Sequence, residues 1–484
     1  MPRSHRGHLT RRAFLRTLAL GAGASVLAAC APAAAPSPTS APSKPADATK
    51  PADASKPAAQ PAATAAPAAK AVAKVDQLTV VINASPWMGG FKAMADEYTK
   101  RSGVKMQLAA FPFDEVFPKE RNAAVNKTNE FDLFTLGESW VAFFFAGGFV
   151  RPIKELAPDF KFDDAVIQYN NLARWNAEKR YFTNDGELLG VPQAGIHQLL
   201  FYRGDKYKEA GLQPPTTWDD VENAAKALHK PDQPFFGYVN RGAKGDAIAW
   251  DWLAHFEGRT QGETGLFKSP PDDWTPTFNN DIGLQALERY IQLAKYAPPN
   301  VGDINQADQI NLMGGDKALQ TVAAASARSA MDDDKQSAVP GKVDFAVVPK
   351  PANGRHAAMS GSFVLAIPKH LPQERQEAGW EFMQWAMTLD AQVEFLKGGG
   401  VPVRTDAYTS SVASEPKFRF SKAMAESAQY THPFFRIPEG PQIRDQLGLR
   451  LNQALVGQMQ PKEALATAEQ EIVKILKEAN YKVG

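Results

Sequence analysis

Cysteine is almost absent from this sequence: Cys30 is the only one in 484 residues. One thiol excludes a disulfide framework within the chain. An excess of charge of one sign is also lacking, because 54 lysines and arginines nearly balance 53 aspartates and glutamates. Such a balance gives no electrostatic footprint for nucleic acid, and we expect no nucleic-acid partner.

Long apolar runs are missing as well. The run at residues 14–29 falls short of the about 20 residues that a bilayer span needs, and Gly21 and Gly23 dilute it. Residues 1–29 hold five arginines and no acid, which is typical of an export signal. The pair Arg11-Arg12 ahead of the run resembles the twin-arginine export motif. The general secretion route stays open as an alternative.

The apolar run ends at Leu27-Ala28-Ala29-Cys30. This ending resembles the lipobox of bacterial lipoproteins, in which the cysteine sulfur carries a lipid. Residues 1–29 are then a cleaved signal peptide, and their removal changes the net charge from +1 to −4. The alternative is a secreted protein that is cut after an Ala-x-Ala site. We expect lipidation of Cys30 and a location on the extracytoplasmic face of the cell membrane.

Residues 30–75 consist almost wholly of Ala, Pro, Ser, Thr, Lys and Asp, with a crude Lys-Pro-Ala-Asp repeat. Nothing bulky is available for burial, so we predict a disordered, Ala/Pro-rich tether. The remaining part of roughly 400 residues exceeds what one hydrophobic core usually organises. Two lobes are therefore expected.

Beyond the tether, short apolar runs, the first of them β-branched, alternate with amphipathic helices. Predicted strands are 78–82, 131–136, 199–203, 235–239, 343–348 and 363–367. Predicted helical faces are 91–98, 221–228 after a cap at Thr217, 287–294, 378–389, and a last one that opens at Pro461. The alternation predicts parallel sheets with helices on both faces. In such sheets, ligands bind beyond the carboxyl ends of the strands.

Three stretches resemble the extracellular solute-binding proteins of ATP-binding cassette importers, in the family 1 group typified by sugar binders. They are "EFDLFTLGESWVAFFFAGGFVRPI", "GELLGVPQAGIHQLLFYRGDKYKEAGLQPPTTWDDVENAAKAL" and "AMSGSFVLAIPKHLPQERQEAGWEFMQWAMTLDAQVEFLKGGGVPVRTDAY". The resemblance implies an α/β, two-lobed periplasmic-binding-protein-like II fold, in which each lobe is a sheet flanked by helices and three hinge crossings join them. Its implied bounds are 76–192 plus 360–402 for the first lobe and 195–358 plus 405–484 for the second.

By this resemblance the protein captures a sugar or oligosaccharide between its lobes and delivers it to the permease subunits of an importer. We expect a monomer without catalysis and without a cofactor. A binding protein for an anionic compound or a polyamine is one alternative. An exported carbohydrate-active enzyme is another, although the chain has no Gly-x-Ser-x-Gly nucleophile motif.

Sugar recognition needs aromatic surfaces and planar polar groups. The loops that the resemblance places at the cleft predict these ligand contacts: Trp87, Glu138, Trp140, His197, Tyr238, Asn240, Arg241, Trp250, Asp251, Ser362 and Arg404. Structural alternatives are core packing for the tryptophans, a satisfied histidine at His197, and a hinge salt bridge at Arg404. No second histidine or acid stands at metal-ligand spacing from His197, so we predict no metal.

Two segments depart from the family's pattern. Ser360-Gly361-Ser362 stands where the family usually has two glycines, although one glycine still allows close approach of a ligand to the backbone. Residues 312–331 hold no aromatic side chain, and Ser326 or Arg328 is the substitute contact that we expect there. A late loop with Phe434 and Phe435 is interpreted as a staple for the last helices.

Overall fold

The computed structural model describes residues 75–484 except 86, 261–264, 428–429 and 433–435. The predicted signal peptide, Cys30, the tether up to residue 74, and the pair Phe434 and Phe435 lie outside the described residues. None of the helices in the described part is both long enough and apolar enough to cross a membrane.

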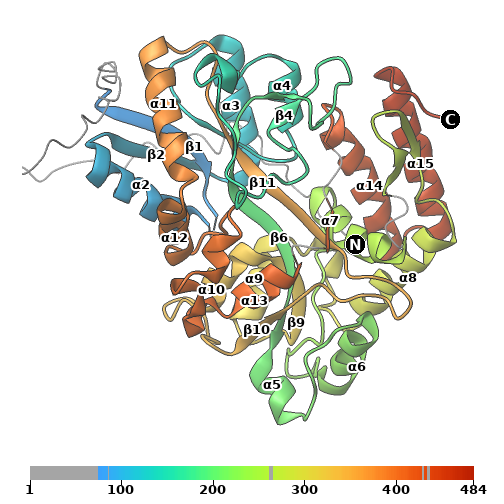
Figure 1. Ribbon diagram of the computed structural model, residues 1–484. Coiled ribbons are helices and arrows are strands. Elements are labelled where there is room, and N and C mark those ends of the chain that lie inside the picture. Colours follow the sequence, from blue (N-terminus) through green and yellow to red (C-terminus); the bar gives the residue numbers. More distant parts are fainter. Residues whose placement is uncertain (1–74, 86, 261–264, 428–429, 433–435) are drawn as a thin grey trace, which may run out of the picture. The chain divides into compact units, whose positions relative to one another are not determined.

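The described part alternates strands with helices from β1 to α4 and then carries runs of consecutive strands and consecutive helices (Figure 1). The strands are β1 Gln77–Asn83, β2 Lys105–Phe111, β3 Phe134–Leu136, β4 Arg174–Trp175, β5 Glu187–Leu188, β6 Val191–Arg203, β7 Phe267–Ser269, β8 Asp273–Pro276, β9 Gln320–Ala324, β10 Val343–Ala346, β11 Ala358–Ala366 and β12 Thr431–His432. The helices are α2 Met88–Ser102, α3 Phe113–Asn126, α4 Val141–Ala146, α5 Gly204–Glu209, α6 Trp218–Leu228, α7 Asp246–Arg259, α8 Asp281–Ala294, α9 Gln306–Gly314, α10 Arg328–Met331, α11 Gln373–Ala386, α12 Leu389–Lys397, α13 Phe420–Ser427, α14 Gly440–Leu455 and α15 Pro461–Glu478.

The first strands form the parallel unit that the sequence predicts. β1 pairs with β2 in parallel, and an isolated parallel bridge joins Val80 of β1 to Leu133 just before β3. α2 lies between β1 and β2 in the chain and buries the predicted face from Phe91 to Tyr98. It ends at Gly103, whose φ of 80° suits a residue without a side chain.

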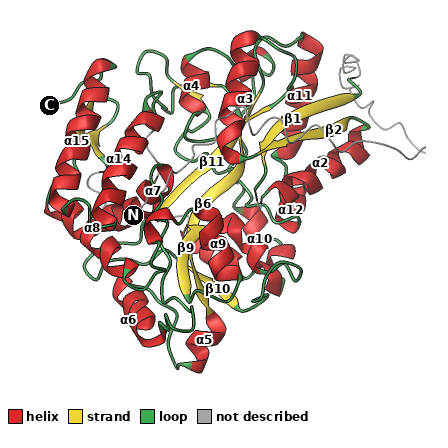
Figure 2. Cartoon of the chain, turned by 180° about the vertical axis from the view of Figure 1, so that it is seen from behind, coloured by secondary structure: helices red, strands yellow, loops and turns green. Residues whose placement is uncertain are grey.

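The central sheet is mostly antiparallel, which corrects the prediction of parallel sheets. β6 pairs antiparallel with β11 through residues 191–197, and with β9 and β10 through residues 198–203. β6 and β11 therefore run side by side through the middle of the structure, with helices around them (Figures 1 and 2). Because the chain passes this point along β6 and returns along β11, the two strands have opposite directions.

Two further elements differ from the prediction. Residues 235–239 form only single bridges, at Phe235 and Phe236, and the Gly237 N–H is bonded to His229 Nδ1 instead of a strand. The predicted face 378–389 belongs to two helices, since Thr388 caps α12 by accepting from the Ala391 N–H. The cap predicted at Thr217 and the helix start predicted at Pro461 are both confirmed.

Buried apolar residues gather in separate clusters. One cluster takes its members from 78–194 and from 363–403. The other three take theirs from 199–359 and from the chain beyond residue 395. The change of cluster falls on β6 and on the segments that follow β11. The lobe boundaries stay a prediction, and this distribution of the core is what we would expect from them.

Candidate functional site

The paired strands β6 and β11 carry the site, because several buried polar groups meet on residues 195–198 and 359–362. Side chains alternate between the two faces of a strand. Gly361 and Phe363 of β11 therefore share one face, and Ser360 and Ser362 share the other.

On the first face, the Glu138 carboxylate lies directly on Gly361: a Cβ at that position would overlap Oε2 and the carboxyl carbon. Arg436 donates from Nε to Glu138 Oε1 at 2.6 Å. Its Nη1 donates to the carbonyl of Tyr169 at 2.7 Å. The side chains of Glu138 and Arg436 are 1% and 3% exposed, so this ion pair is fully buried.

Glu138 comes shortly after the end of β3. Asn83 is the last residue of the parallel neighbour β1, and Ser85 comes shortly after it. We call these three residues and Arg436 the edge cluster. Three of its buried atoms have no hydrogen-bond partner among the described residues: Asn83 Oδ1, Ser85 Oγ and Arg436 Nη2. Unpartnered buried polar atoms are costly and rare in native proteins. Asn83, Ser85 and Glu138 stand at the carboxyl ends of the neighbouring strands β1 and β3, where ligands of parallel sheets bind.

Two tyrosines border the edge cluster. Burial raises the pKa of Tyr169, and the negative charge of Glu138 raises it further. Burial also raises the pKa of Tyr181, where the positive charge of Arg436 partly opposes the effect. The Tyr169 hydroxyl lies against Gly195 of β6, where a Cβ would come within 2.7 Å of it.

His197 lies on the other face of the paired strands. Its Nδ1 is 3.0 Å from Ser360 Oγ, and its Nε2 is 2.6 Å from Ser427 Oγ on α13. Burial lowers the pKa of His197 to about 4, so the ring is neutral at physiological pH. Both ring nitrogens are engaged within the protein, and a solute contact at His197 stays a prediction.

The three predicted tryptophans are buried. Trp87 packs on Phe363 with ring centroids 4.9 Å apart. Trp140 donates from Nε1 to Glu120 at 2.8 Å and packs on Phe113. Trp250, like Trp252, lies on α7, and it is 8% exposed. Solute contacts at these three tryptophans stay predictions.

Four further predicted residues, at positions 238–251, form one network. Arg241 holds Asp251 through a buried ion pair, and Gln198 Nε2 donates to the same carboxylate at 3.2 Å. Burial raises the pKa of Asp251, and the Arg241 charge opposes the rise. Asn240 donates to the Tyr290 carbonyl at 3.0 Å. Tyr238 is buried beside this network.

The network reaches the paired strands through Gln198, whose Oε1 accepts from the Met359 N–H at 3.2 Å. Ser362 donates to the Phe363 carbonyl and accepts from the Gln193 N–H. Both amide atoms of the buried Gln193 side chain lack a hydrogen-bond partner among the described residues.

Arg404 lies apart from the edge cluster and makes the salt bridges of the structural alternative. Its guanidinium pairs with Asp406 and Asp163. Its Nη1 donates to the Met387 carbonyl at 3.0 Å. A pocket of about 230 Å³ opens beside it, with Phe160 and Thr388 in its lining.

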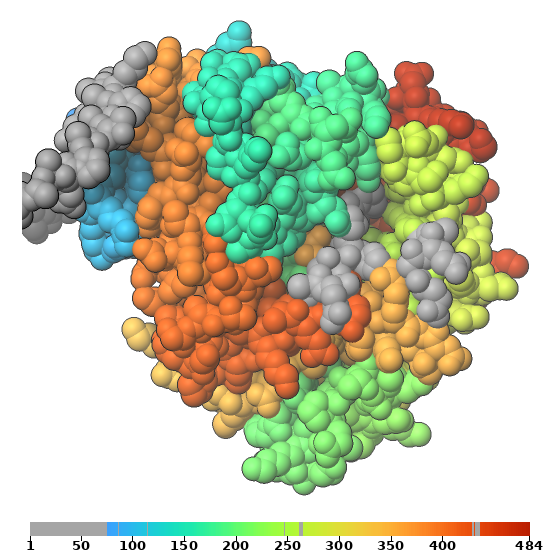
Figure 3. Space-filling view, viewed as in Figure 1, coloured from blue at the N-terminus to red at the C-terminus, as the bar shows by residue number. Residues whose placement is uncertain are grey.

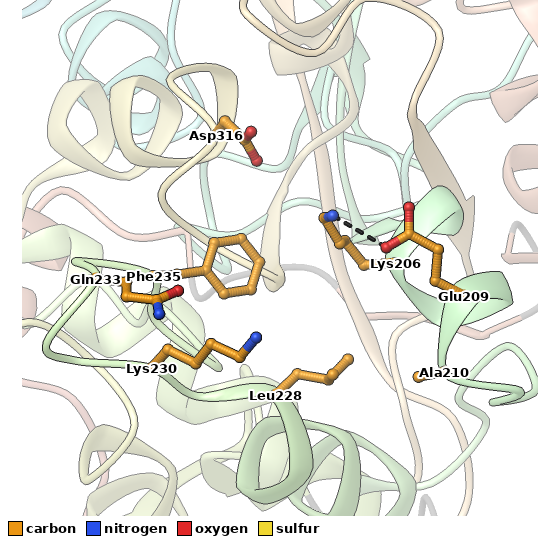
Figure 4. Close-up of a pocket in the computed structure, with 8 residues that line it drawn as sticks. All are labelled: Lys206, Glu209, Ala210, Leu228, Lys230, Gln233, Phe235 and Asp316. Carbon is orange, nitrogen blue, oxygen red and sulfur yellow. Dashed lines mark hydrogen bonds and ion pairs between the residues drawn. The ribbon is translucent and has the colours of Figure 1, made fainter.

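A larger pocket of about 410 Å³ lies between α5 and the end of α6. Lys206, Lys230, Phe235 and Asp316 contribute to its wall, and Lys206 pairs with Glu209 at 3.0 Å (Figure 4). None of the predicted site residues lines it.

Arg328, a substitute contact considered for the segment without aromatics, is buried. Its Nη2 donates to the Gly400 carbonyl at 2.9 Å, and its guanidinium lies 4.0 Å from the Phe420 ring centroid. Within the described residues, no group of three or more His, Cys, Asp or Glu side chains is placed to hold a metal ion.

Sequence reasoning missed Arg436, Asn83, Ser85 and Gln193. Asn83 and Ser85 carried a usable signal, because they stand at the carboxyl end of a predicted strand. Arg436 carried none, since its partner Glu138 is 298 positions away.

The segment 169–182 touches the last helices of the chain. Arg180 Nη2 pairs with Glu439 at 3.2 Å, its Nη1 donates to the Ala479 carbonyl, and its guanidinium lies 5.0 Å from the Tyr481 ring centroid. Tyr181 packs edge-on against Trp274. We call this segment the clasp. Figure 3 shows the teal-to-green part of the chain at the surface, next to the yellow part.

Solved structures define the class of this fold. The chain is similar to a ribitol complex of a solute-binding protein from Agrobacterium radiobacter K84, with a TM-score of 0.69, 24% identity, and coverage of 82% of this chain and 98% of that one. It is also similar to a D-mannitol complex from Agrobacterium vitis S4, with a TM-score of 0.66, 23% identity, and coverage of 84% and 100%. The fold is that of the type II periplasmic binding proteins.

The family model described as "Bacterial extracellular solute-binding protein" matches residues 84–393. The protein belongs to this family, whose members bind solutes and are not enzymes. A mannitol-binding protein of Pseudomonas aeruginosa is 28% identical over 374 residues, which cover 73% of this chain and 82% of the relative.

Proposed function

We propose that this protein is a lipid-anchored binding protein on the extracytoplasmic face of the cell membrane. It captures a neutral sugar or sugar alcohol and delivers it to the permease subunits of an ATP-binding cassette importer. Its membership of the solute-binding family supports the importer partner. The Lys-Pro-Ala-Asp tether would keep the binding part close to that permease, at a high local concentration.

One observation carries the choice of solute: the edge cluster buries a donor, Arg436 Nη2, and two oxygens, Asn83 Oδ1 and Ser85 Oγ, that have no hydrogen-bond partner in the described part of the chain. Adjacent hydroxyls of a polyol both donate and accept, so they complement such a mixed set. The mannitol-binding relative and the similar structures in complex with ribitol and D-mannitol agree with this chemistry.

The packing of the tryptophans bears on the kind of solute. Trp87 and Trp140 contact other side chains of the core, which favours a framework role over a stacking platform. A pyranose uses such a platform for its C–H face, whereas an open-chain polyol has no flat apolar face. We therefore place a sugar alcohol or a small sugar ahead of an oligosaccharide.

The anionic and polyamine alternatives are weaker for an electrostatic reason. Arg241 and Arg404 are each paired with carboxylates, so neither offers an unbalanced positive charge. Arg328 is engaged by the Leu396 and Gly400 carbonyls and by the Phe420 ring. Glu138 and Asp251 are paired with arginines, so they do not form the carboxylate cage that a polyamine needs.

A thermal-shift screen tests the solute class. D-mannitol, ribitol, maltose, gluconate, phosphate and spermidine are each added at millimolar concentration. A ligand at 100 times its Kd stabilises the folded state by about 2.7 kcal/mol, so we expect Tm to rise by several degrees with a polyol or sugar. A rise with phosphate, gluconate or spermidine alone would overturn the proposal.

Fractionation of cells tests the anchor. Cys30→Ala should move the protein from the membrane fraction to the soluble extracytoplasmic fraction while solute binding is retained. A Ser25→Ala variant serves as the control, because it changes the signal region and keeps the thiol. Membrane association that survives Cys30→Ala would contradict lipidation. Export that is unchanged in an Arg11→Lys/Arg12→Lys variant would favour the general secretion route.

A further inference from the structure

The edge cluster contains a complete ion pair in addition to its unpartnered atoms. Glu138 and Arg436 come from segments 298 positions apart, and both side chains are buried. Replacing a buried ion pair by apolar groups is often neutral or stabilising. Stability alone therefore does not explain why these two charges are buried, and a functional role is the better explanation.

Both partners are held firmly in place. Glu138 lies on Gly361, because only a residue without Cβ leaves room for its carboxylate. Arg436 is fixed by two strong contacts, Nε to Glu138 at 2.6 Å and Nη1 to the Tyr169 carbonyl at 2.7 Å. One polar atom of the pair, Arg436 Nη2, is left buried without a hydrogen-bond partner in the described part of the chain.

We infer that the Glu138–Arg436 pair sets the charge selectivity of the solute site, so that the site admits a neutral polyhydroxyl solute and rejects its acidic and amino analogues. This inference rests on the proposed function. Arg436 Nη2 donates to a solute hydroxyl, and that hydroxyl needs no compensating charge.

The physical reason is desolvation. A charged solute loses its hydration on entering a buried site, and this costs several kcal/mol in real proteins. The Glu138–Arg436 pair offsets little of this desolvation cost, because a charged solute is attracted to one member of the pair and repelled by the other. Removing either charge unbalances the pair and creates a preference for the opposite charge on the solute.

Among the described residues, Arg444 is a further buried charged side chain next to the pair: it donates from Nη2 to the carbonyl of Ser139, the residue after Glu138, at 3.1 Å. It is unchanged in the variants below. Ratios of affinities between variants therefore cancel its contribution and report on the Glu138–Arg436 pair.

Calorimetric titration with three matched solutes tests the inference. D-mannitol, D-mannonate and 1-amino-1-deoxy-D-mannitol share one carbon chain and differ in charge at a single end. The unmodified protein should bind mannitol at least about tenfold more tightly than either charged analogue. Glu138→Gln should raise the affinity for mannonate relative to mannitol by about tenfold or more, and Arg436→Gln should do the same for the amine.

Asp132→Asn is the matched control, because Asp132 forms an ion pair with Arg375 and neither residue belongs to the edge cluster. It should leave all three affinity ratios unchanged. Ratios that stay constant in the Glu138 and Arg436 variants, or that move in the same direction in both, would overturn the inference. A wild-type preference for a charged analogue would overturn it as well. Failure of the unmodified protein to bind any of the three would contradict the proposed function itself.

A crystal structure of the unmodified protein with D-mannitol covers the case in which a single variant does not fold. We expect a mannitol oxygen within hydrogen-bond distance of Arg436 Nη2. Mannitol bound with no contact to Arg436 would overturn the inference.

Discussion

His197 is neutral in the folded protein because burial lowers its pKa to about 4. In the unfolded chain its pKa returns to about 6.5, so the unfolded state binds more protons between these two values. The stability that neutral His197 provides is therefore complete above about pH 6.5 and is lost as the pH falls toward 4.

We predict that His197→Gln reduces the acid sensitivity of folding. Between pH 7 and pH 4.5, the unmodified protein should lose about 2 to 3 kcal/mol more unfolding free energy than the variant. Urea unfolding at the two pH values measures both losses. Equal losses in the two proteins would show that His197 does not titrate as its burial requires.

The surroundings of Gly361 leave no room for a side chain at this position. Gly361→Ala must push Glu138 away from Arg436, because the new methyl group would overlap the carboxylate. We expect a loss of about 2 kcal/mol or more in stability, as for other strained changes in packed interiors, and at least tenfold weaker solute binding.

Gly379→Ala is the control for this prediction. Gly379 is buried within α11, and a Cβ there would meet its nearest neighbour at 3.4 Å. Alanine also favours the helix by roughly 0.5 to 1 kcal/mol. Binding should be unchanged in this variant. Similar effects of the two substitutions on binding would show that Glu138 is not seated by Gly361.

At the scale of single residues, the sequence predicted candidate site residues from their positions after predicted strands. Glu138 follows a predicted strand at 131–136, and a site beyond the carboxyl end of a strand is a general expectation. Its partner Arg436 could not be predicted, because nothing local marks a loop residue that pairs across 298 positions. Arg404 was interpreted both as a ligand contact and as a hinge salt bridge, and the geometry supplies the salt bridge.

At the scale of elements, α6 shows how much a local signal determines. Thr217 accepts from the Asp220 N–H, and the Asp220 side chain accepts from the Thr217 N–H. We predict that Thr217→Ala lowers the unfolding free energy by about 1 kcal/mol, measured by urea unfolding. Thr217→Ser keeps the hydroxyl and should cost much less. Equal costs for both variants would place the loss in packing instead of the cap.

Strand direction shows where local signals stop. Apolar runs predicted strands only at 199–203 of β6 and 363–367 near the end of β11, and the strand residues 191–198 and 358–362 were missed. The direction of pairing depends on which distant strand lies alongside. The antiparallel pair Ser360 and His197 joins residues 163 positions apart. A reading of neighbours along the chain therefore favoured parallel sheets. The sequence did not predict the break between α11 and α12, because the helical spacing of apolar residues continues through the cap at Thr388.

At the scale of the whole molecule, the clasp joins segments that belong to different predicted lobes. Arg180 pairs with Glu439, although its side chain is 43% exposed. We predict that Arg180→Ala raises the solute dissociation rate about two- to fivefold, because it weakens one contact that holds the lobes together. Stopped-flow measurement of D-mannitol release gives the rate. Lys179→Ala, at an exposed neighbouring position, should leave it unchanged. An unchanged rate in Arg180→Ala would show that the clasp does not restrain opening.

The central claim is that this family member binds a neutral polyhydroxyl solute at the edge cluster. Titration of D-mannitol into the purified protein, with ribitol, phosphate and spermidine in parallel, tests it most directly. We predict a one-to-one isotherm for a polyol, with no heat of binding for phosphate or spermidine. A one-to-one isotherm for phosphate or spermidine, with none for either polyol, would contradict the claim.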